Sequence, residues 1–307
     1  MTGEHTAVLG TRGSRLALVQ AEGCAVALRN AGIEVEVRII KTTSEHQPDT
    51  PLAVIDQRDV FTRQLDEALL SGEIDLAVHS LKDVPTGLPE GISLCAVTRR
   101  HDPSDVLVSD ERYTLDDLPH ESVVATSSLR RMAQLLHHRP DLQIVGIRGN
   151  VDTRVRKMRE GAADAVVLAS AGLERLGLEA LHTVIPADTV LPAVGQGALA
   201  AVTLQDHPLH GRIREVLNHA PTERAVLAER AMLRALEGGC RVPVGASSAV
   251  EGTVVRLRGI VISPDGALVY RGEAEGEEPE EVGERLAWDL LEQGAAVVLR
   301  EIREVRR

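Results

Sequence analysis

Short apolar segments with the pattern of β-strands alternate with helical segments along most of the chain. Residues 8–10 and 34–40 have the pattern of strands, and residues 15–30 between them have helical spacing, with Ser14 placed to cap the helix. The alternation restarts after 101–103. Such a pattern is typical of α/β units around a largely parallel sheet. The further predicted elements are helices over 60–71, 129–137 and 153–160 and strands over 74–78, 94–97, 122–125, 143–147 and 165–169.

The chain is predicted to cross twice between two such units. The Gly- and Pro-rich segment 191–197 has the composition of a return crossing. Two lobes joined by two crossings form a cleft, which is a common place for a ligand. We therefore predict a discontinuous first α/β lobe from residues 1–98 and 197–216, a second α/β lobe over 103–192, and a small C-terminal α+β domain over 217–307.

The C-terminal domain is predicted to open with a helix from Pro221 to about Glu237. Strand-like runs follow over 254–262 and 267–270, and a helix is predicted over 281–293. The acidic stretch 273–281 has the composition of a solvated loop.

The bulk composition argues against several classes of protein. The formal net charge of −12 argues against a nucleic-acid or anionic-membrane partner, because phosphate contacts need a basic surface. No apolar run approaches the ~18–20 residues of a membrane span. The N-terminus has neither the cationic nor the apolar region of a secretory signal. We therefore expect a cytoplasmic protein that binds no nucleic acid and no membrane. We also expect a monomer.

The three cysteines, Cys24, Cys95 and Cys240, are widely spaced. This spacing excludes a CxxC metal site and makes a disulfide framework unexpected, and we predict no metal. Cys24 falls in a predicted helix and Cys95 in a predicted strand, so both are expected to be small core residues. Cys240 follows two glycines after a helix end and precedes Arg241, which favours an accessible thiolate. On spacing alone, Cys240 is either an inert loop cysteine or a functional thiol.

A polar cluster, His-Ser-Leu-Lys-Asp-Val-Pro at 79–85, follows a buried strand. The carboxyl ends of strands in open α/β sheets are where ligands bind, and Pro85 favours an extended Val84. Asp83 is therefore a candidate functional carboxylate, the alternative being a turn residue or helix cap. His79 has the pattern of a hydrogen-bonded strand histidine rather than a base.

Three strand-to-helix turns carry hydroxyl groups and arginines, at 12–14, 126–131 and 148–154. Backbone N–H groups at a helix N-terminus, with hydroxyl and guanidinium groups, form a cradle for an anion. Arginine pairs with carboxylates through two parallel hydrogen bonds. One such turn is explained by capping, but three of them, together with Arg175, predict a small ligand that carries several carboxylates.

Five segments together resemble the porphobilinogen deaminase (hydroxymethylbilane synthase) family in order and spacing. They are Ala-Val-His-Ser-Leu-Lys-Asp-Val-Pro at 77–85, Thr-Ser-Ser-Leu-Arg-Arg at 126–131, Arg-Gly-Asn at 148–150, Leu-Pro-Ala-Val-Gly-Gln-Gly-Ala at 191–198 and Leu-Glu-Gly-Gly-Cys at 236–240. The resemblance implies two lobes like those of type II periplasmic binding proteins, followed by a third, α+β domain. It also implies a transferase of tetrapyrrole (heme) biosynthesis, which condenses four porphobilinogen molecules stepwise, head to tail, into hydroxymethylbilane and releases ammonia.

The same resemblance implies roles for individual residues. A dipyrromethane cofactor is expected on Cys240 through a thioether, since a thiolate adds readily to the electrophilic methylene of an activated pyrrole. Asp83 is expected to be the catalytic carboxylate, which stabilises the cation left when the amine departs and shuttles protons. The cofactor-binding residues implied are Lys82, Ser128, Arg130, Arg131 and Arg148, and the substrate-binding residues implied are Arg12, Ser14, Arg154, Arg175, Phe61 and Gln196.

The sequence departs from the family pattern before Phe61. The family has a Gly- and Lys-rich lid there, whereas residues 54–60 contain no glycine and two acids, and Thr-Ser-Glu-His at 43–46 lacks the family's Arg and Gly. Phe61 is therefore predicted either to pack over the cofactor rings or to be a core residue. Two alternatives to the active enzyme stay open. They are a non-catalytic binding or sensor protein for an anionic small molecule, and a relative of low activity.

Overall fold

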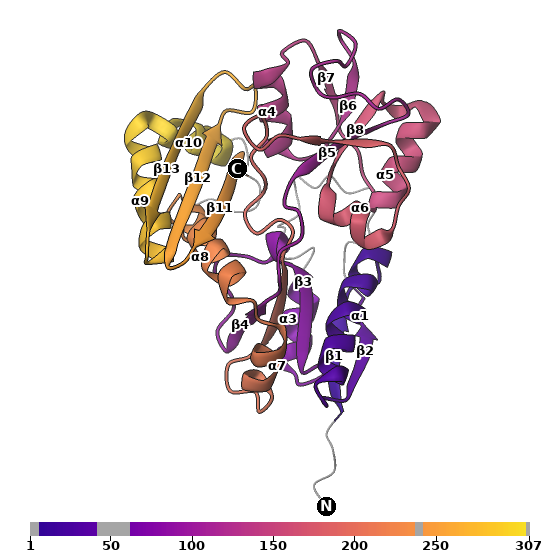
Figure 1. The fold of residues 1–307 in the computed structure, drawn as a ribbon, viewed down its shortest axis with the longest axis vertical. Helices are drawn as coiled ribbons and strands as arrows, with labels where there is room; N and C mark the ends of the chain where they lie inside the picture. The colour runs from indigo at the N-terminus through magenta and orange to yellow at the C-terminus, as the bar shows by residue number, and fades with distance from the viewer. Residues whose placement is uncertain (1–5, 42–61, 237–241, 305–307) are drawn as a thin grey trace, which may run out of the picture. The chain divides into compact units, whose positions relative to one another are not determined.

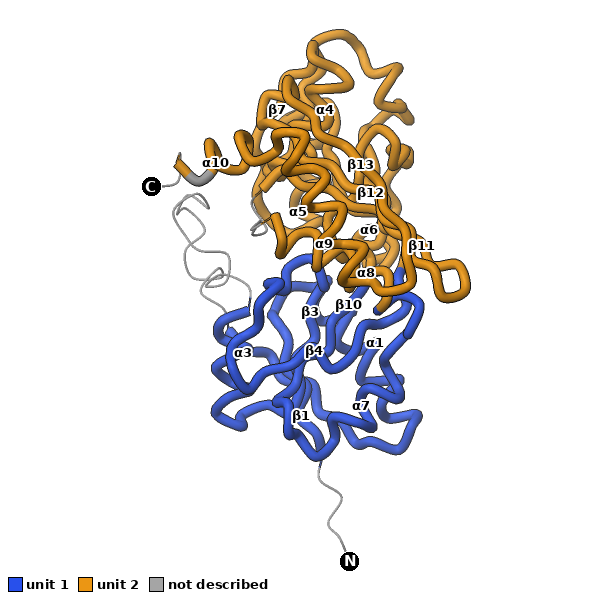
Figure 2. Tube along the Cα trace, turned by 90° about the vertical axis from the view of Figure 1, so that its left-hand side faces the viewer, with its two compact units in different colours: residues 1–100, 198–223 blue, residues 101–197, 224–307 orange. Residues whose placement is uncertain are grey.

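The computed structural model describes residues 6–41, 62–236 and 242–304 (Figure 1). The chain divides into two compact units, coloured separately in Figure 2. The first comprises Met1–Arg100 and Ala198–Glu223, and the second comprises His101–Gly197 and Arg224–Arg307.

The first unit is built around a five-stranded sheet of order β2-β1-β3-β10-β4. Four strands run parallel, and β10 runs antiparallel to both of its neighbours. The apolar side chains of one sheet face pack against α1 and α7, while α3 covers the other face, where its Leu65 approaches Gly10. The elements are β1 (Ala7–Thr11), α1 (Arg15–Asn30), β2 (Val35–Ile39), α3 (Arg63–Leu70), β3 (Leu76–Ser80), β4 (Ile92–Val97), β10 (Leu199–Leu204) and α7 (His210–Leu217).

The second unit contains a sheet with the same pattern of directions, in the order β7-β6-β8-β5-β9. Here β5 is the antiparallel strand. Alternate residues of β5 face opposite ways: Val106 and Val108 pack toward α5 and α6, and Leu107 packs toward α4. The elements are β5 (Asp105–Ser109), β6 (Val123–Ala125), α4 (Leu129–His138), β7 (Gln143–Val145), α5 (Val151–Lys157), its continuation η3 (Met158–Ala162), β8 (Ala165–Ala169), α6 (Ser170–Leu176) and β9 (His182–Ile185).

A three-stranded antiparallel sheet forms the C-terminal part of the second unit. Its strand β12 points Val255 and Leu257 toward helices α8 and α9, and points Ile260 and Ile262 toward Ala133 of α4. One face of the sheet is therefore apolar, and on the other face the C-terminal part of β12 is buried, with α4 as a neighbour. The elements are α8 (Ala220–Ala235), β11 (Val244–Glu251), β12 (Val254–Ile262), β13 (Val269–Gly276), α9 (Pro279–Leu290), η4 (Leu291–Ala295) and α10 (Ala296–Glu304).

Most of the predicted elements are present. The helix over 15–30, its Ser14 cap and the strands over 165–169 and 254–262 match α1, β8 and β12 to the residue. The largely parallel sheet is confirmed as four parallel strands with one antiparallel strand in each lobe. Residues 60 and 61 of the helix predicted over 60–71 lie outside the described residues. The three domain ranges stay a prediction.

The acidic stretch 273–281 was expected to be a solvated loop, and this expectation is wrong. Residues 273–276 belong to strand β13, and Pro279 opens helix α9. The strand lies at the edge of its sheet, so its acidic side chains reach solvent while its backbone stays paired with β12. Glu275 forms an ion pair with Arg256 on the neighbouring strand at 3.0 Å. The composition of an edge strand therefore resembles that of a loop.

Candidate functional site

The carboxyl ends of β1 and β3 carry the predicted site residues of the first unit. Arg12 follows β1, and Ser14 caps α1 by accepting a hydrogen bond from the Ala17 N–H at 3.3 Å. Lys82 and Asp83 lie in a short 3-10 turn, η2 (Leu81–Asp83), directly after β3. Since β1 and β3 are paired in parallel, both sets of residues lie at one edge of the sheet.

Asp83 occupies a turn, and its side chain is half-buried. Val84 has an extended backbone after it, as the following Pro85 predicts. Asp83 therefore follows a buried strand, as expected of a functional carboxylate, and also lies in a turn, as the alternative hypothesis expected. A catalytic role for Asp83 stays a prediction.

His79, at the end of β3, is buried, and its ring is neutral near pH 7. Burial, together with the nearby charge of Arg12, lowers the pKa of His79 to about 4. Its Nε2 is buried and has no hydrogen-bond partner in the part of the chain that the structure describes. The expectation of a fully hydrogen-bonded strand histidine is therefore not met within these residues.

In the second unit, the turn between β6 and α4 is held together by its own hydroxyl groups. Thr126 Oγ1 accepts from the Ser128 N–H at 3.2 Å, and Ser128 Oγ accepts from the Arg131 N–H at 3.4 Å, which caps α4. Ser127 Oγ both donates to and accepts from the backbone of Ile147, at 2.7 and 2.9 Å. The turn is thereby fixed at the N-terminus of a helix, where N–H groups and the helix dipole favour an anion.

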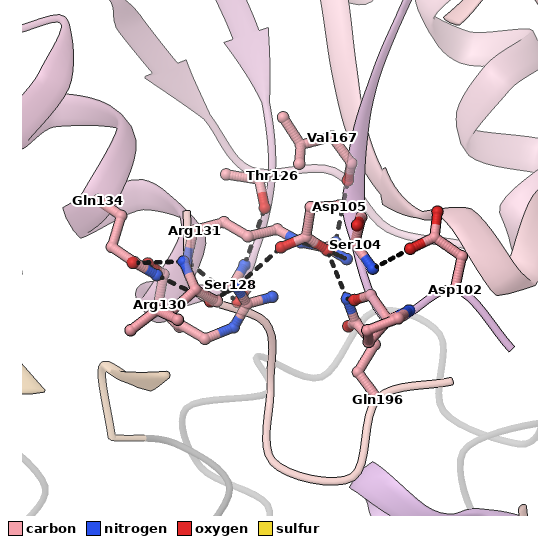
Figure 3. Close-up of polar contacts among 12 residues, drawn as sticks. Asp102, Ser104, Asp105, Thr126, Ser128, Arg130, Arg131, Gln134, Val167 and Gln196 are labelled. Carbon is pink, nitrogen blue, oxygen red and sulfur yellow. Dashed lines mark hydrogen bonds and ion pairs between the residues drawn. The ribbon is translucent and has the colours of Figure 1, made fainter. Parts of the chain in front are cut away.

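Arg130 and Arg131 extend from this helix into the protein and meet the carboxylate of Asp105 (Figure 3). Arg130 Nη1 lies 2.8 Å from Asp105 Oδ2, and Arg131 donates from Nε and Nη2 to Oδ1 at 3.1 and 2.7 Å. Arg131 Nη1 also donates to the Val167 carbonyl at 2.9 Å. The exposed fractions are 5% for Arg130, 6% for Arg131 and 0% for Asp105, so this is a buried ion cluster.

Gln196, predicted to bind substrate, belongs to the same cluster. Its Nε2 donates to Asp105 Oδ1 at 2.8 Å and to the Pro103 carbonyl at 2.6 Å, and the residue is buried. Asp105 Oδ1 therefore accepts hydrogen bonds from both α4 and the return crossing. Direct contact of Gln196 with a substrate stays a prediction.

The cluster holds two guanidinium groups against one carboxylate. Burial alone would raise the pKa of Asp105, but the charges of Arg130 and Arg131 outweigh burial and hold this pKa well below the usual range of an aspartate. Asp105 is therefore ionised, and with both guanidinium groups charged the three side chains carry one net positive charge away from solvent. Such a charge favours binding of an anion beside the cluster.

The remaining predicted arginines of this unit lie at its turns. Arg148 is exposed after β7, and Arg154 Nε donates to the Gly149 carbonyl at 2.8 Å, which braces that turn. Gly149 has a φ of 113°, a conformation that favours glycine. Arg175 Nη2 donates to the Gly197 carbonyl at 2.7 Å and so links α6 to the return crossing. Their contacts with a ligand stay predictions.

Two predicted site residues, Cys240 and Phe61, lie outside the described residues. Cys24 and Cys95 are buried in α1 and β4, as expected for core residues. Burial raises the pKa of the Cys95 thiol, which keeps it protonated and unreactive. Within the described ranges, no group of His, Cys, Asp and Glu side chains is arranged to hold a metal ion.

Sequence reasoning missed Asp105 and Gln134, both fully buried. Asp105 opens the apolar strand Asp-Val-Leu-Val-Ser, and a carboxylate at the start of a buried run needs a cationic partner. That signal was available in the sequence. Gln134 has no comparable signal, because a single glutamine in an amphipathic helix is unremarkable.

Comparison with known proteins decides the family. The family model described as "Porphobilinogen deaminase, dipyromethane cofactor binding domain" matches residues 7–210, and the model described as "Porphobilinogen deaminase, C-terminal domain" matches residues 224–292. The chain belongs to the porphobilinogen deaminase family. It is thus an enzyme of tetrapyrrole biosynthesis, a hydroxymethylbilane synthase, as the sequence predicts, and the predicted dipyrromethane cofactor is named in the first description.

Relatives within the porphobilinogen deaminase family match over nearly the full chain. The porphobilinogen deaminase of Rubrobacter xylanophilus is 66% identical over 299 residues, covering 97% of this chain and 98% of the relative. The porphobilinogen deaminase of Desulforudis audaxviator is 48% identical, covering 96% of this chain and 97% of the relative. That of Syntrophomonas wolfei is 46% identical, covering 96% of this chain and 98% of the relative. Membership of this family favours the enzyme over the alternative of a binding or sensor protein.

The predicted fold class is confirmed as α/β, with two mixed five-stranded sheets and a small C-terminal antiparallel sheet. A periplasmic substrate-binding protein of an ABC transporter from Coxiella burnetii is similar over 73% of this chain and 97% of its own, at 16% identity and a TM-score of 0.45. The methionine-binding protein MetQ is similar over 69% and 89%, at a TM-score of 0.44.

Asp105→Asn should destabilise the protein by about 3–5 kcal/mol, because it leaves two buried guanidinium groups without a counter-charge. The folded-state pKa lies below the ordinary value of 3.8, so the unfolded chain takes up the proton first. The ion pair therefore contributes fully above that value, and the difference between variant and wild type should shrink as the pH falls below it. Urea unfolding across a pH series measures both effects.

The exposed pair of Glu22 and Arg29, at 2.6 Å on α1, provides the matched control. Glu22→Gln should change the free energy of unfolding by no more than about 1 kcal/mol. If Asp105→Asn lowers the free energy of unfolding by as little as the control does, the buried cluster does not stabilise the protein as predicted.

Proposed function

We propose that the chain condenses four porphobilinogen molecules stepwise into hydroxymethylbilane on a dipyrromethane attached to Cys240. The observation that best supports the binding part of this proposal is the buried, positively charged cluster of Asp105, Arg130 and Arg131. The family membership supports the reaction.

The residues present fit a dipyrromethane. Its acetate and propionate arms are carboxylates, and the cluster offers two guanidinium groups whose charge one aspartate only half balances. The N-terminus of α4 adds N–H groups, and Ser128 adds a hydroxyl. We assign Ser128, Arg130, Arg131 and Arg148 to these arms. When bound, the dipyrromethane supplies the covalent anchor for the growing pyrrole chain.

We assign proton transfer to Asp83. A carboxylate in a turn at the end of a buried strand combines access to substrate with a fixed backbone, which η2 and the extended Val84 provide here. The Oδ atoms of Asp83 would hold the proton that the departing amine requires, and the ionised carboxylate would stabilise the cation left behind. Lys82, Arg12 and Ser14 lie at the same sheet edge. We assign Lys82 to the dipyrromethane, and Arg12 and Ser14 to the carboxylates of the incoming porphobilinogen.

Arg154, Arg175 and Gln196 are proposed to support substrate binding from the second unit. Their described contacts are with the backbone of Gly149, with the backbone of Gly197 and with Asp105, respectively. Each of these contacts braces a turn or a crossing, so we propose that part of their effect on the substrate is indirect.

We also infer that the enzyme works in the cytoplasm as a monomer. Buried thiols at Cys24 and Cys95 suit a reducing compartment. In the part of the chain described, no helix has the length and apolar character needed to cross a membrane.

The first test is the intact mass of the purified protein. The wild type should carry an excess over the polypeptide mass that matches two linked pyrroles, because the thioether survives denaturation. Cys240→Ser should show the bare polypeptide mass, while Cys24→Ser keeps the excess, since Cys24 is buried in α1. The same excess on the Cys240→Ser protein would contradict attachment at this position.

The second test concerns turnover. Asp83→Asn should lower the rate of hydroxymethylbilane formation from porphobilinogen by about 10²–10⁴-fold, since the amide neither carries the proton nor stabilises the cation. The side chain is half-buried in a turn, so the free energy of unfolding should change by less than about 1 kcal/mol. A variant with near wild-type turnover would exclude Asp83 as the catalytic carboxylate. A wild type that forms no product would favour the alternative of a low-activity relative.

A further inference from the structure

Gln134 lies one helical turn after Arg130 on α4, and its side chain is fully buried. Its Oε1 accepts a hydrogen bond from the Leu191 N–H at 2.8 Å. Its Nε2 donates to the carbonyls of Leu191 and Arg130, each at 3.2 Å. The amide thus binds both the N–H and the C=O of one residue in the return crossing.

The Leu191 carbonyl has a second donor, which is Arg130 itself. Arg130 Nη1 donates to this carbonyl at 2.6 Å and lies 2.8 Å from Asp105 Oδ2. The guanidinium group is therefore held between one backbone carbonyl and one carboxylate. Figure 3 shows Gln134 and Arg130 projecting from the same helix. The position of the Leu191 carbonyl sets one of the two contacts that orient Arg130.

The C-terminal sheet holds Leu191 from its other side. The Pro192 carbonyl accepts from the Ala246 N–H of β11 at 2.9 Å. A Cβ atom added to Gly245 would lie 2.8 Å from the Leu191 carbonyl oxygen, so only a glycine allows this close approach. The Leu191 side chain packs with Ala133, Ile260 and Ile262. Leu191 is thereby clamped between α4 and the C-terminal sheet, all within the second unit.

We propose that Gln134 is a positioning residue for the cofactor site. Through the Leu191 carbonyl it sets the orientation in which Arg130 receives a carboxylate of the dipyrromethane. The task requires a side chain that donates and accepts at once, which an amide does and a carboxylate or an alkyl group does not. Gln134 acts through Arg130 and need not touch the ligand. The inference rests on the proposed function, because it takes Arg130 to be a cofactor ligand.

The test compares the melting temperature of the full chain with that of its Cys240→Ser form. The difference between the two forms, here called the cofactor increment, measures the stabilisation that the bound group provides. Gln134→Met keeps the length of the side chain but removes its hydrogen bonds to Leu191. We expect it to lower both melting temperatures and, in addition, to reduce the cofactor increment by about 2–4 °C.

Thr203→Val is the matched control. Thr203 is fully buried in β10 of the first unit, and its Oγ1 makes hydrogen bonds with His210 Nδ1 and the Leu204 carbonyl, both at 3.0 Å. The variant also removes buried hydrogen bonds from a packed sheet. It should lower both melting temperatures equally and leave the cofactor increment at the wild-type value.

A purely structural role for Gln134 makes a different prediction. If Gln134→Met lowers both melting temperatures and keeps the wild-type increment, the proposal is overturned. Should Gln134→Met fail to fold, Gln134→Leu answers the question, because it also removes both hydrogen bonds to Leu191 and adds no charge beside Arg130. Its increment should also fall, and an unchanged increment again overturns the proposal. A wild type with no increment would contradict the proposed cofactor attachment instead.

Discussion

A buried carboxylate shared by two buried guanidinium groups is the constraint on which the second unit depends. Removing these three charges from water costs several kcal/mol for each ion, and the ion pairs and hydrogen bonds within the cluster offset that cost. These contacts come from three segments of the chain. Asp105 lies at the start of β5, and both arginines lie in the first turn of α4. Gln196 and the Leu191 carbonyl belong to the return crossing. Segments 91 residues apart in the sequence therefore meet at one point.

The same cluster carries an excess positive charge. The cluster contains one guanidinium group more than its single carboxylate balances, and both arginines lie in the first turn of a helix. Our proposal that Arg130 and Arg131 bind the carboxylates of the cofactor rests on this excess charge. Because Leu191 is clamped by the C-terminal sheet, Arg130 is also held in register with that sheet through the Leu191 carbonyl.

The sequence predicts well those helices and strands whose residues follow a regular local pattern. Ser14 and the helix after it, β8 and β12 follow from local pattern alone, since capping and apolar alternation depend on neighbours in the chain. The antiparallel strands β5 and β10 were missed, because each is the first strand after a crossing and its pairing partners are distant in sequence. The strand predicted over 267–270 continues to Gly276 as β13, and this acidic second half was missed because an edge strand tolerates exposed acidic residues.

The sequence predicted which kinds of residue form the candidate site better than it predicted where their side chains point. The pattern of arginines and hydroxyls at strand ends correctly placed Ser128 at the start of a helix. It did not show that Arg130 and Arg131 point into the protein, because that direction depends on Asp105, which enters from another strand. Gln134 had no local signal at all, since its partners lie in the return crossing.

The most direct test of this account is the intact mass of purified Arg131→Met. This substitution removes the second guanidinium group but leaves Asp105 paired with Arg130 and Gln196, so the chain should still fold. The account predicts a folded protein found mainly at the bare polypeptide mass, because the excess positive charge that holds the cofactor is gone. A folded variant that carries the full wild-type excess would contradict it.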